Sequence, residues 1–202
     1  MEIYKDKALI INTKNPNTIL DSIPKSKVLK SYANGIAQVM VNWGLDEVIA
    51  LSRIVKFPPS PITKDYNWPG IYKPFNHQKE TADFLSAHKR AYCLSEAGTG
   101  KTSGVIWAAD YLMEQGKINR MLVICPLSIM KAAWESDFFK TAMHRTVAIA
   151  HGSPEKRKKI LAQNTDVVVI NYDGIEVVRK ELQEGGFDLI VVDEANYIKT
   201  VT

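Results

Sequence analysis

Apolar and polar residues form alternating blocks from Pro74 onward, with runs of strand length separated by stretches of helical periodicity. The runs of strand length are AYCLS, RMLVICP, TVAIAHG, DVVVINY and FDLIVVDEAN, beginning at residues 91, 120, 146, 166 and 187. Between two of them, TSGVIWAADYLMEQG (102–116) places apolar residues on one helical face, and Gly116 can end that helix. Strands that are apolar throughout are typical of parallel sheets covered on both faces. The pattern predicts an α/β fold with a right-handed parallel sheet of five strands flanked by helices.

The first seventy residues have a different pattern. ALIIN, AQVMVNW and SRIVKF are strand-like, and LDEVIALSR is helical. Residues 57–70, FPPSPITKDYNWPG, contain four prolines and end in Gly70, which is typical of a linker. We therefore expect a small α+β accessory domain at 1–57, a Pro-rich linker at 58–70 and the main domain at 71–202.

Composition excludes several classes of protein. Of the 202 residues, 46% are apolar and 24% charged, as in folded globular proteins. No apolar run approaches the ~20 residues of a membrane span, and the N-terminus has no secretory pattern. Cys93 and Cys125 are isolated, which favours buried thiols in a reducing compartment. We expect no membrane partner and a cytoplasmic location in a bacterium or phage-infected cell, or a nuclear one in a eukaryote.

The positive charge is unevenly placed. The net charge is +4, and residues 1–73 carry ten Lys and Arg against six Asp and Glu, whereas residues 74–202 carry sixteen of each. A basic N-terminal third is a weak indication of a polyanionic partner, and a solvated basic surface explains it nearly as well.

The strongest chemical signal is SEAGTGKT at residues 95–102. It differs from the phosphate-binding pattern G-x-x-x-x-G-K-[ST] only at its first position, Ser95. Gly98 and Gly100 allow the backbone of the loop, which includes Ala97 and Thr99, to turn its N–H groups toward a phosphate at a helix N-terminus. Lys101 would reach the β- and γ-phosphates of ATP, and the Thr102 hydroxyl would bind Mg²⁺.

A second signal is LIVVDEAN at residues 189–196. Asp193 and Glu194 follow four apolar residues, so two carboxylates lie at the carboxyl end of a buried strand, where α/β folds bind their ligands. Asp193 would hold Mg²⁺ through water, and Glu194 would orient and deprotonate the attacking water.

GTGKT and DEAN together resemble the phosphate loop and DEAD/DEAH box of superfamily-two helicases, which often replace the first loop glycine. More specifically, the chain resembles the Snf-type (Swi/Snf-related) DNA translocases over about residues 72–202. In PFNHQ, Gln78 takes the place of that family's adenine-recognising glutamine. Further similarities are LVICPLSIMKAAWESDFFK, AIAHGSPEKRKK, VVVINYDGI and VVDEANYIKT. The family usually has histidine where this chain has Asn196.

The resemblance implies a RecA-like lobe that binds ATP and Mg²⁺ and acts on double-stranded or branched DNA. Ser128 follows a strand at a helix N-terminus, where it can cap the helix or contact a nucleic-acid phosphate, and Lys131 lies one turn further on. The EKRKK cluster at 155–159 is more typical of a solvated helix face, and Trp134 has the spacing of a core residue. Tyr72 or Phe75 could stack on adenine or pack within the loop.

The same resemblance implies a second RecA-like lobe in the same chain, which carries an arginine finger. The chain ends eight residues after Glu194, so we expect a fragment that binds ATP weakly and hydrolyses it hardly at all on its own. The basic accessory domain resembles, more weakly, modules that precede the motor in phage and bacterial Snf-like proteins.

Two other functions remain open from the sequence. An AAA+-type ATPase also uses GTGKT and a strand ending in Asp-Glu, but that function leaves Gln78 and CPLS unexplained. A non-catalytic DNA-binding module would retain the fold without turnover, although intact Lys101, Thr102, Asp193 and Glu194 argue against it.

Overall fold

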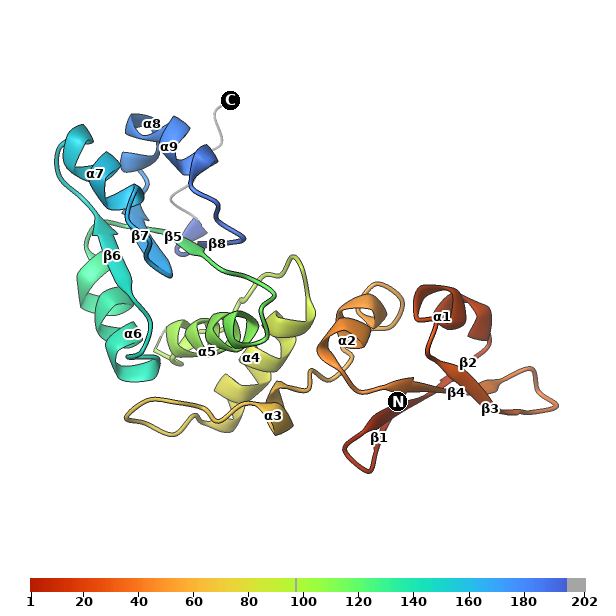
Figure 1. The fold of residues 1–202 in the computed structure, drawn as a ribbon. Coiled ribbons are helices and arrows are strands. Elements are labelled where there is room, and N and C mark those ends of the chain that lie inside the picture. Colours follow the sequence, from red (N-terminus) through yellow and green to blue (C-terminus); the bar gives the residue numbers. More distant parts are fainter. Residues whose placement is uncertain (97, 196–202) are drawn as a thin grey trace. The chain divides into compact units, whose positions relative to one another are not determined.

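The computed structural model describes residues 1–96 and 98–195 (Figure 1). Contacts group Met1–Asn67 with Lys79–Glu96 in a first compact unit, and Trp68–Gln78 with the described chain from residue 98 onward in a second. Within these described ranges, no helix combines the length and the apolar character needed to cross a bilayer.

The first unit is built on an antiparallel sheet in the order β1-β2-β4-β3. Its strands are β1 (Glu2–Tyr4), β2 (Ala8–Thr13), β3 (Lys27–Ser31) and β4 (Ala37–Asn42), and its helices are α1 (Pro16–Ser22), α2 (Leu45–Leu51) and α3 (Ile62–Asp65). Leu9 pairs with Val41, and Ile11 with Val39. All four side chains are buried, because alternate residues of a strand point to the same face of the sheet.

The prediction of a strand at SRIVKF is wrong. Helix α2 ends at Leu51, and residues 52–54 form a turn directly after it. The main-chain N–H groups of Ile54 and Val55 both bind the carbonyl oxygen of Leu51, at 2.8 Å each. This turn packs both side chains against the core of the first unit, so their apolar surface is covered without strand pairing.

The second unit contains a parallel sheet in the order β6-β7-β5-β8. Its strands are β5 (Met121–Cys125), β6 (Val147–Ala150), β7 (Val167–Asn171) and β8 (Leu189–Val192). Its helices are α5 (Lys101–Glu114), η1 (Met130–Glu135), α6 (Ser136–Thr141), α7 (Pro154–Leu161), α8 (Gly174–Val177) and α9 (Arg179–Glu184). Helix α4 (Asn76–Ala87) begins in this unit and continues in the first.

Helices cover both faces of the parallel sheet (Figure 1). Met121, Val123 and Cys125 face a core formed with α5, η1 and α6. Leu122 faces a second core, to which α7 contributes Leu161. This arrangement confirms the predicted α/β fold of a parallel sheet flanked by helices, preceded by a small α+β part.

The prediction of a parallel strand at AYCLS is wrong. Residues 91–96 have no regular secondary structure, and the side chains of Tyr92 and Leu94 are 87% and 91% exposed. Strands β5 and β7 already have a neighbour on each side, so only the outer edges of β6 and β8 could pair with it. A run of only four apolar residues buries too little surface at such an edge to offset the entropy of ordering it.

Candidate functional site: a phosphate loop and an acidic strand end

The phosphate loop enters α5 through two glycines in the left-handed conformation. Gly98 has a φ of 79°, and Gly100, the residue that precedes the first turn of α5, has a φ of 71° and a ψ of 33°. No side chain caps this helix N-terminus, and the positive end of a helix attracts an anion. Successive N–H groups in this geometry form a concave site for an anion. Ala97 lies outside the described residues.

Gln78 lies directly on this loop. Its Nε2 donates a hydrogen bond to the carbonyl oxygen of Gly100 at 3.4 Å, and its Oε1 accepts one from the N–H of Phe75 at 2.9 Å. His77 Nε2 lies 2.9 Å from the carbonyl oxygen of Thr99. The start of α4 and the phosphate loop are therefore joined by two side chains, of which the sequence singled out only Gln78.

Replacing Gly100 by alanine is expected to destabilise the chain by about 1–3 kcal/mol and to weaken nucleotide binding. A side chain at this φ is strained, and its Cβ would collide with the amide nitrogen of Gln78. Urea unfolding and nucleotide titration would measure both effects. Gly116→Ala is the matched control, because Gly116 also has a positive φ of 63° but a Cβ there meets no atom within 4 Å. If Gly100→Ala and Gly116→Ala lost equal stability and equal nucleotide affinity, the contact between Gln78 and Gly100 would have no part in either effect.

The two aromatic side chains proposed to stack on adenine are both exposed. Tyr72 is 66% exposed and Phe75 is 69% exposed. The Phe75 ring stacks on His77, with centroids 5.7 Å apart and planes 12° apart. Because His77 also contacts Thr99, Phe75 is the one of the two linked to the phosphate loop.

The acidic strand end is held by three elements of the second unit. Asp193 follows β8, and its N–H continues the pairing with β5 through the carbonyl oxygen of Ile124 at 2.9 Å. Its carboxylate accepts hydrogen bonds from the indole Nε1 of Trp134 at 3.0 Å and from the N–H of Glu194 at 2.9 Å. Its carbonyl oxygen accepts one from the Tyr172 hydroxyl at 2.6 Å. Glu194 is exposed and has a φ of 53°, and Asn196 lies outside the described residues.

The Cys125 thiol and the Tyr172 hydroxyl near Asp193 both have raised pKa values. Burial, with a smaller contribution from Asp193, raises the pKa of the Cys125 thiol to about 12. Burial and the negative charges of Asp193 and Glu194 also raise the pKa of Tyr172. Near neutral pH the Tyr172 hydroxyl therefore keeps its proton and remains a donor to Asp193.

The loop and the acidic strand end are attached to one helical stretch at different points. Trp134 in η1 binds Asp193, whereas Thr141 at the end of α6 donates to the Ser103 hydroxyl of α5 at 3.5 Å. Seven residues separate the two contacts, on the order of 10 Å along a helix axis. That the loop and the acidic strand end form one ATP site stays a prediction.

The residue types at both places fit a magnesium nucleotide. A Cβ at Gly98 would meet no heavy atom within 4 Å, which leaves room for an anion above the loop. The Thr102 hydroxyl and the Asp193 carboxylate supply oxygen atoms, the ligands that Mg²⁺ prefers. Each oxygen of Asp193 accepts one N–H in the structure and retains acceptor capacity for a metal-bound water.

The candidate DNA contacts both lie on the surface. Ser128 and Lys131 are exposed, in the turn after β5 and in the first turn of η1. Of the two roles open to Ser128, the structure does not show the cap, because Ile129 occupies the N-cap position and no side chain caps this helix. Ser128 sits one residue too early, in a turn closed by the Ile129 N–H on the carbonyl oxygen of Pro126. Its hydroxyl is thus not engaged as a cap.

The EKRKK cluster is not a uniformly solvated face. Arg157 is only 8% exposed and donates to the carbonyl oxygens of Ala150 and Gly152 and to the side chain of Asn171. It therefore ties the ends of β6 and β7 together. Lys158 forms an ion pair with Glu181 at 2.8 Å, so it too has a local partner.

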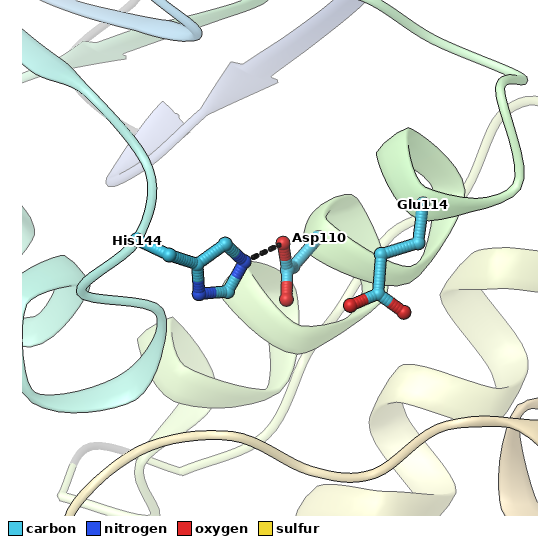
Figure 2. A group of neighbouring side chains, drawn as sticks. All are labelled: Asp110, Glu114 and His144. Carbon is cyan, nitrogen blue, oxygen red and sulfur yellow. Dashed lines mark hydrogen bonds and ion pairs between the residues drawn. The ribbon is translucent and has the colours of Figure 1, made fainter.

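A separate group of titratable side chains lies between α5 and the segment before β6 (Figure 2). Asp110 is buried, and its Oδ1 receives both His144 Nε2 at 2.9 Å and Arg145 Nε at 2.5 Å. Burial and the charge of Asp110 raise the pKa of nearby Glu114. Because a guanidinium already binds the buried carboxylate, the group is best explained as an ion-pair network that attaches α5 to the sheet.

Comparisons with known proteins place the chain in a family. The profile of the SNF2-related domain matches residues 77–202. Switch 2 of Arabidopsis thaliana is 31% identical, over 76% of this chain and 19% of that protein. The ISWI chromatin-remodeling complex ATPase of Saccharomyces cerevisiae is 27% identical, over 76% of this chain and 14% of that protein. An uncharacterized ATP-dependent helicase of Mycoplasma genitalium is 28% identical, over 52% of this chain and 10% of that protein.

A solved structure has a similar fold. The SWI2/SNF2 ATPase core of Sulfolobus solfataricus, in complex with double-stranded DNA, superimposes with a TM-score of 0.57 at 27% identity, over 66% of this chain and 28% of that one. The chain therefore spans less than a third of each of these proteins.

Proposed function

The chain belongs to the SNF2-related family, and from this premise we propose that it is the first RecA-like lobe of an ATP-dependent DNA helicase or translocase. The observation that carries the proposal is the phosphate loop at α5, with two left-handed glycines and Gln78 bound to Gly100. An AAA+-type ATPase gives no reason for Gln78 in that position.

In this proposal each site residue has a distinct role. Lys101 neutralises the β- and γ-phosphates of ATP, and Gln78 recognises adenine. Thr102 binds Mg²⁺ directly and Asp193 binds it through water, so that the metal can stabilise the charge that develops on the phosphates. Glu194 orients the attacking water and accepts its proton.

Duplex or branched DNA is the proposed substrate. The structural neighbour named above is a complex with double-stranded DNA. Ser128 and Lys131 are exposed beside the carboxyl end of β5, at the N-terminal end of a helical stretch, which favours contacts with phosphates over contacts with bases. The basic residues of 1–73 would add a second, sequence-independent attraction to DNA.

A second lobe is part of the same proposal. Phosphoryl transfer in such motors gains orders of magnitude in rate from an arginine finger, which we place in a further lobe of the full protein. The proposed division is an accessory domain at 1–57, a linker at 58–70 and the first lobe from 71 onward.

The proposal is tested by measuring Mg·ATP binding and ATP hydrolysis by this chain, with and without duplex DNA. We expect detectable binding of ATP and of DNA, with little turnover. Turnover that does not respond to DNA and accompanies self-association would favour an AAA+-type ATPase. A folded chain that binds neither ATP nor DNA would contradict the proposal.

A further inference from the structure

Asp193 accepts hydrogen bonds on its carboxylate and on its main-chain carbonyl oxygen from residues of other elements. Three separate elements meet at this residue: β8 carries it, η1 supplies Trp134 and the residue after β7 supplies Tyr172. We propose that Trp134 and Tyr172 are positioning residues, which fix the Asp193 carboxylate in the orientation that receives the magnesium ion. This inference rests on the proposed function of Asp193.

The Trp134 side chain has one polar group, the indole N–H, and it donates a hydrogen bond to the Asp193 carboxylate. The side chain is 1% exposed and lies between Met130 and Phe138, which are also buried and recur at four-residue spacing. The Phe138 ring lies 6.4 Å from the indole. A buried indole N–H needs an acceptor, and many carbonyl oxygens could serve as well. Here the acceptor is the ionisable oxygen of the proposed metal residue.

Trp134 also lies in an unusual part of its helix. Residues Met130–Glu135 are π-helical, and the α-helix resumes at Ser136. Single π-helical turns interrupt regular helices and occur frequently at functional sites, because the wider turn changes which side chains face inward. This interruption coincides with the residue that reaches Asp193.

Tyr172 fixes the backbone of the same residue. Its hydroxyl donates to the carbonyl oxygen of Asp193 at 2.6 Å and lies 3.4 Å from that of Glu194. Glu194 has a left-handed φ of 53°, a conformation that non-glycine residues keep only when their surroundings enforce it. In that conformation the Glu194 N–H reaches the Asp193 carboxylate at 2.9 Å. The hydroxyl therefore helps to hold the backbone that aims both acidic side chains.

Together these contacts leave Asp193 little freedom to rotate. Trp134 holds one carboxylate oxygen, the Glu194 N–H holds the other, and Tyr172 holds the main chain. Loss of a residue that orients a direct metal ligand typically lowers metal affinity by about 10- to 100-fold, and for Asp193, which would hold Mg²⁺ through water, we expect the lower end of that range. We therefore expect the loss of either side-chain donor to affect binding of Mg²⁺ with nucleotide more than binding of nucleotide alone.

The test compares the affinity of the chain for a non-hydrolysable ATP analogue in Mg²⁺ and in EDTA, by calorimetry. The wild-type chain should bind more tightly in Mg²⁺. Trp134→Phe should reduce this ratio by about tenfold and leave the EDTA affinity unchanged. Tyr172→Phe, which removes one hydroxyl from a half-buried ring, should reduce it by about threefold.

Trp107→Phe is the matched control. Trp107 lies in the same unit, is 3% exposed and donates its indole N–H to the carbonyl oxygen of Pro69 at 2.9 Å. The same substitution thus removes a buried indole hydrogen bond that does not touch Asp193, so the Mg²⁺-to-EDTA ratio should not change. Circular dichroism would confirm that each variant is folded, and Tyr172→Phe decides the question should Trp134→Phe fail to fold.

Nuclear magnetic resonance of the indole N–H groups tests independently whether Trp134 responds to Mg²⁺. The indole N–H resonance of Trp134, assigned by its loss in Trp134→Phe, should shift when Mg²⁺ is added with the analogue, and that of Trp107 should shift less. An unchanged Mg²⁺ ratio in both Trp134→Phe and Tyr172→Phe would overturn this inference alone. The magnesium role of Asp193 would be overturned as well by either of two results. One is a wild-type chain that binds the analogue equally in Mg²⁺ and in EDTA, and the other is an Asp193→Asn chain with the same Mg²⁺-to-EDTA ratio as the wild type.

Discussion

Replacing Lys101 by alanine is expected to weaken binding of Mg·ATP to the chain on the order of 100-fold, about 3 kcal/mol. Lys101 is the first residue of α5, directly after the left-handed Gly100, so its ammonium is the cationic group that the phosphate loop itself would supply. Its loss would leave the phosphate charge balanced by Mg²⁺ and the loop N–H groups, without the ammonium. In a form of the protein that turns over ATP, hydrolysis should fall by about 10²- to 10³-fold.

The measurement is a titration of the chain with a fluorescent ATP analogue in Mg²⁺. Lys117→Ala serves as the control, because Lys117 is an exposed lysine of the same unit that follows the C-terminal end of α5. It removes the same charge without touching the loop and should bind nucleotide as the wild type does. Wild-type affinity in Lys101→Ala would show that the loop is not the phosphate site.

Replacing Asp110 by asparagine is expected to lower the free energy of unfolding by about 3 kcal/mol. Asp110 is 1% exposed and receives Arg145 and His144 on the same oxygen. The Arg145 side chain is itself only 17% exposed, so asparagine would leave a largely buried guanidinium without its main counter-charge. The remaining pairing of Arg145 with Asp166, at 3.9 Å, is too long to replace it.

Urea unfolding followed by circular dichroism measures this effect. Glu181→Gln is the comparison, since it removes an ion pair with Lys158 at 2.8 Å whose two side chains are partly exposed. Exposed pairs contribute little to stability, so this variant should unfold almost as the wild type does. If Asp110→Asn were equally stable, the network between α5 and the segment before β6 would have no stabilising role.

Local sequence was enough to identify most elements of the second unit. The runs at 120–126, 146–152, 166–172 and 187–196 each contain a strand of the parallel sheet. Strand β7 is buried on both faces, as an uninterrupted apolar run predicts. The prediction of a buried strand before Asp193 is wrong for one face of β8, where Ile190 and Val192 are 58% and 41% exposed. Gly116, with a φ of 63°, follows the end of α5 as predicted. The loop glycines were also readable, since only glycine takes the left-handed conformation there without strain.

The wrong predictions concern contacts between residues far apart in the chain: strand pairing and the hydrogen-bond partners of side chains. AYCLS has the composition of a strand, but so short a run buries too little surface at the outer edge of β6 or β8 to be ordered there. In SRIVKF, Ile54 and Val55 are packed against the core by a turn after α2 and not by strand pairing. Arg157 stands in a basic cluster, yet it is buried because three acceptors from β6, β7 and the turn between β6 and α7 meet around it.

Local sequence was sufficient to predict a phosphate loop, an acidic strand end and the chain positions of β5, β6, β7 and β8. It did so because these features depend on residues that are neighbours in the chain. Which side chains come into contact depends on the packing of the elements. Trp134 was recognisable as a core residue, but its single N–H could have met any acceptor. That it meets Asp193, 59 residues later, follows only from the packing of η1 beside the carboxyl ends of β5 and β8.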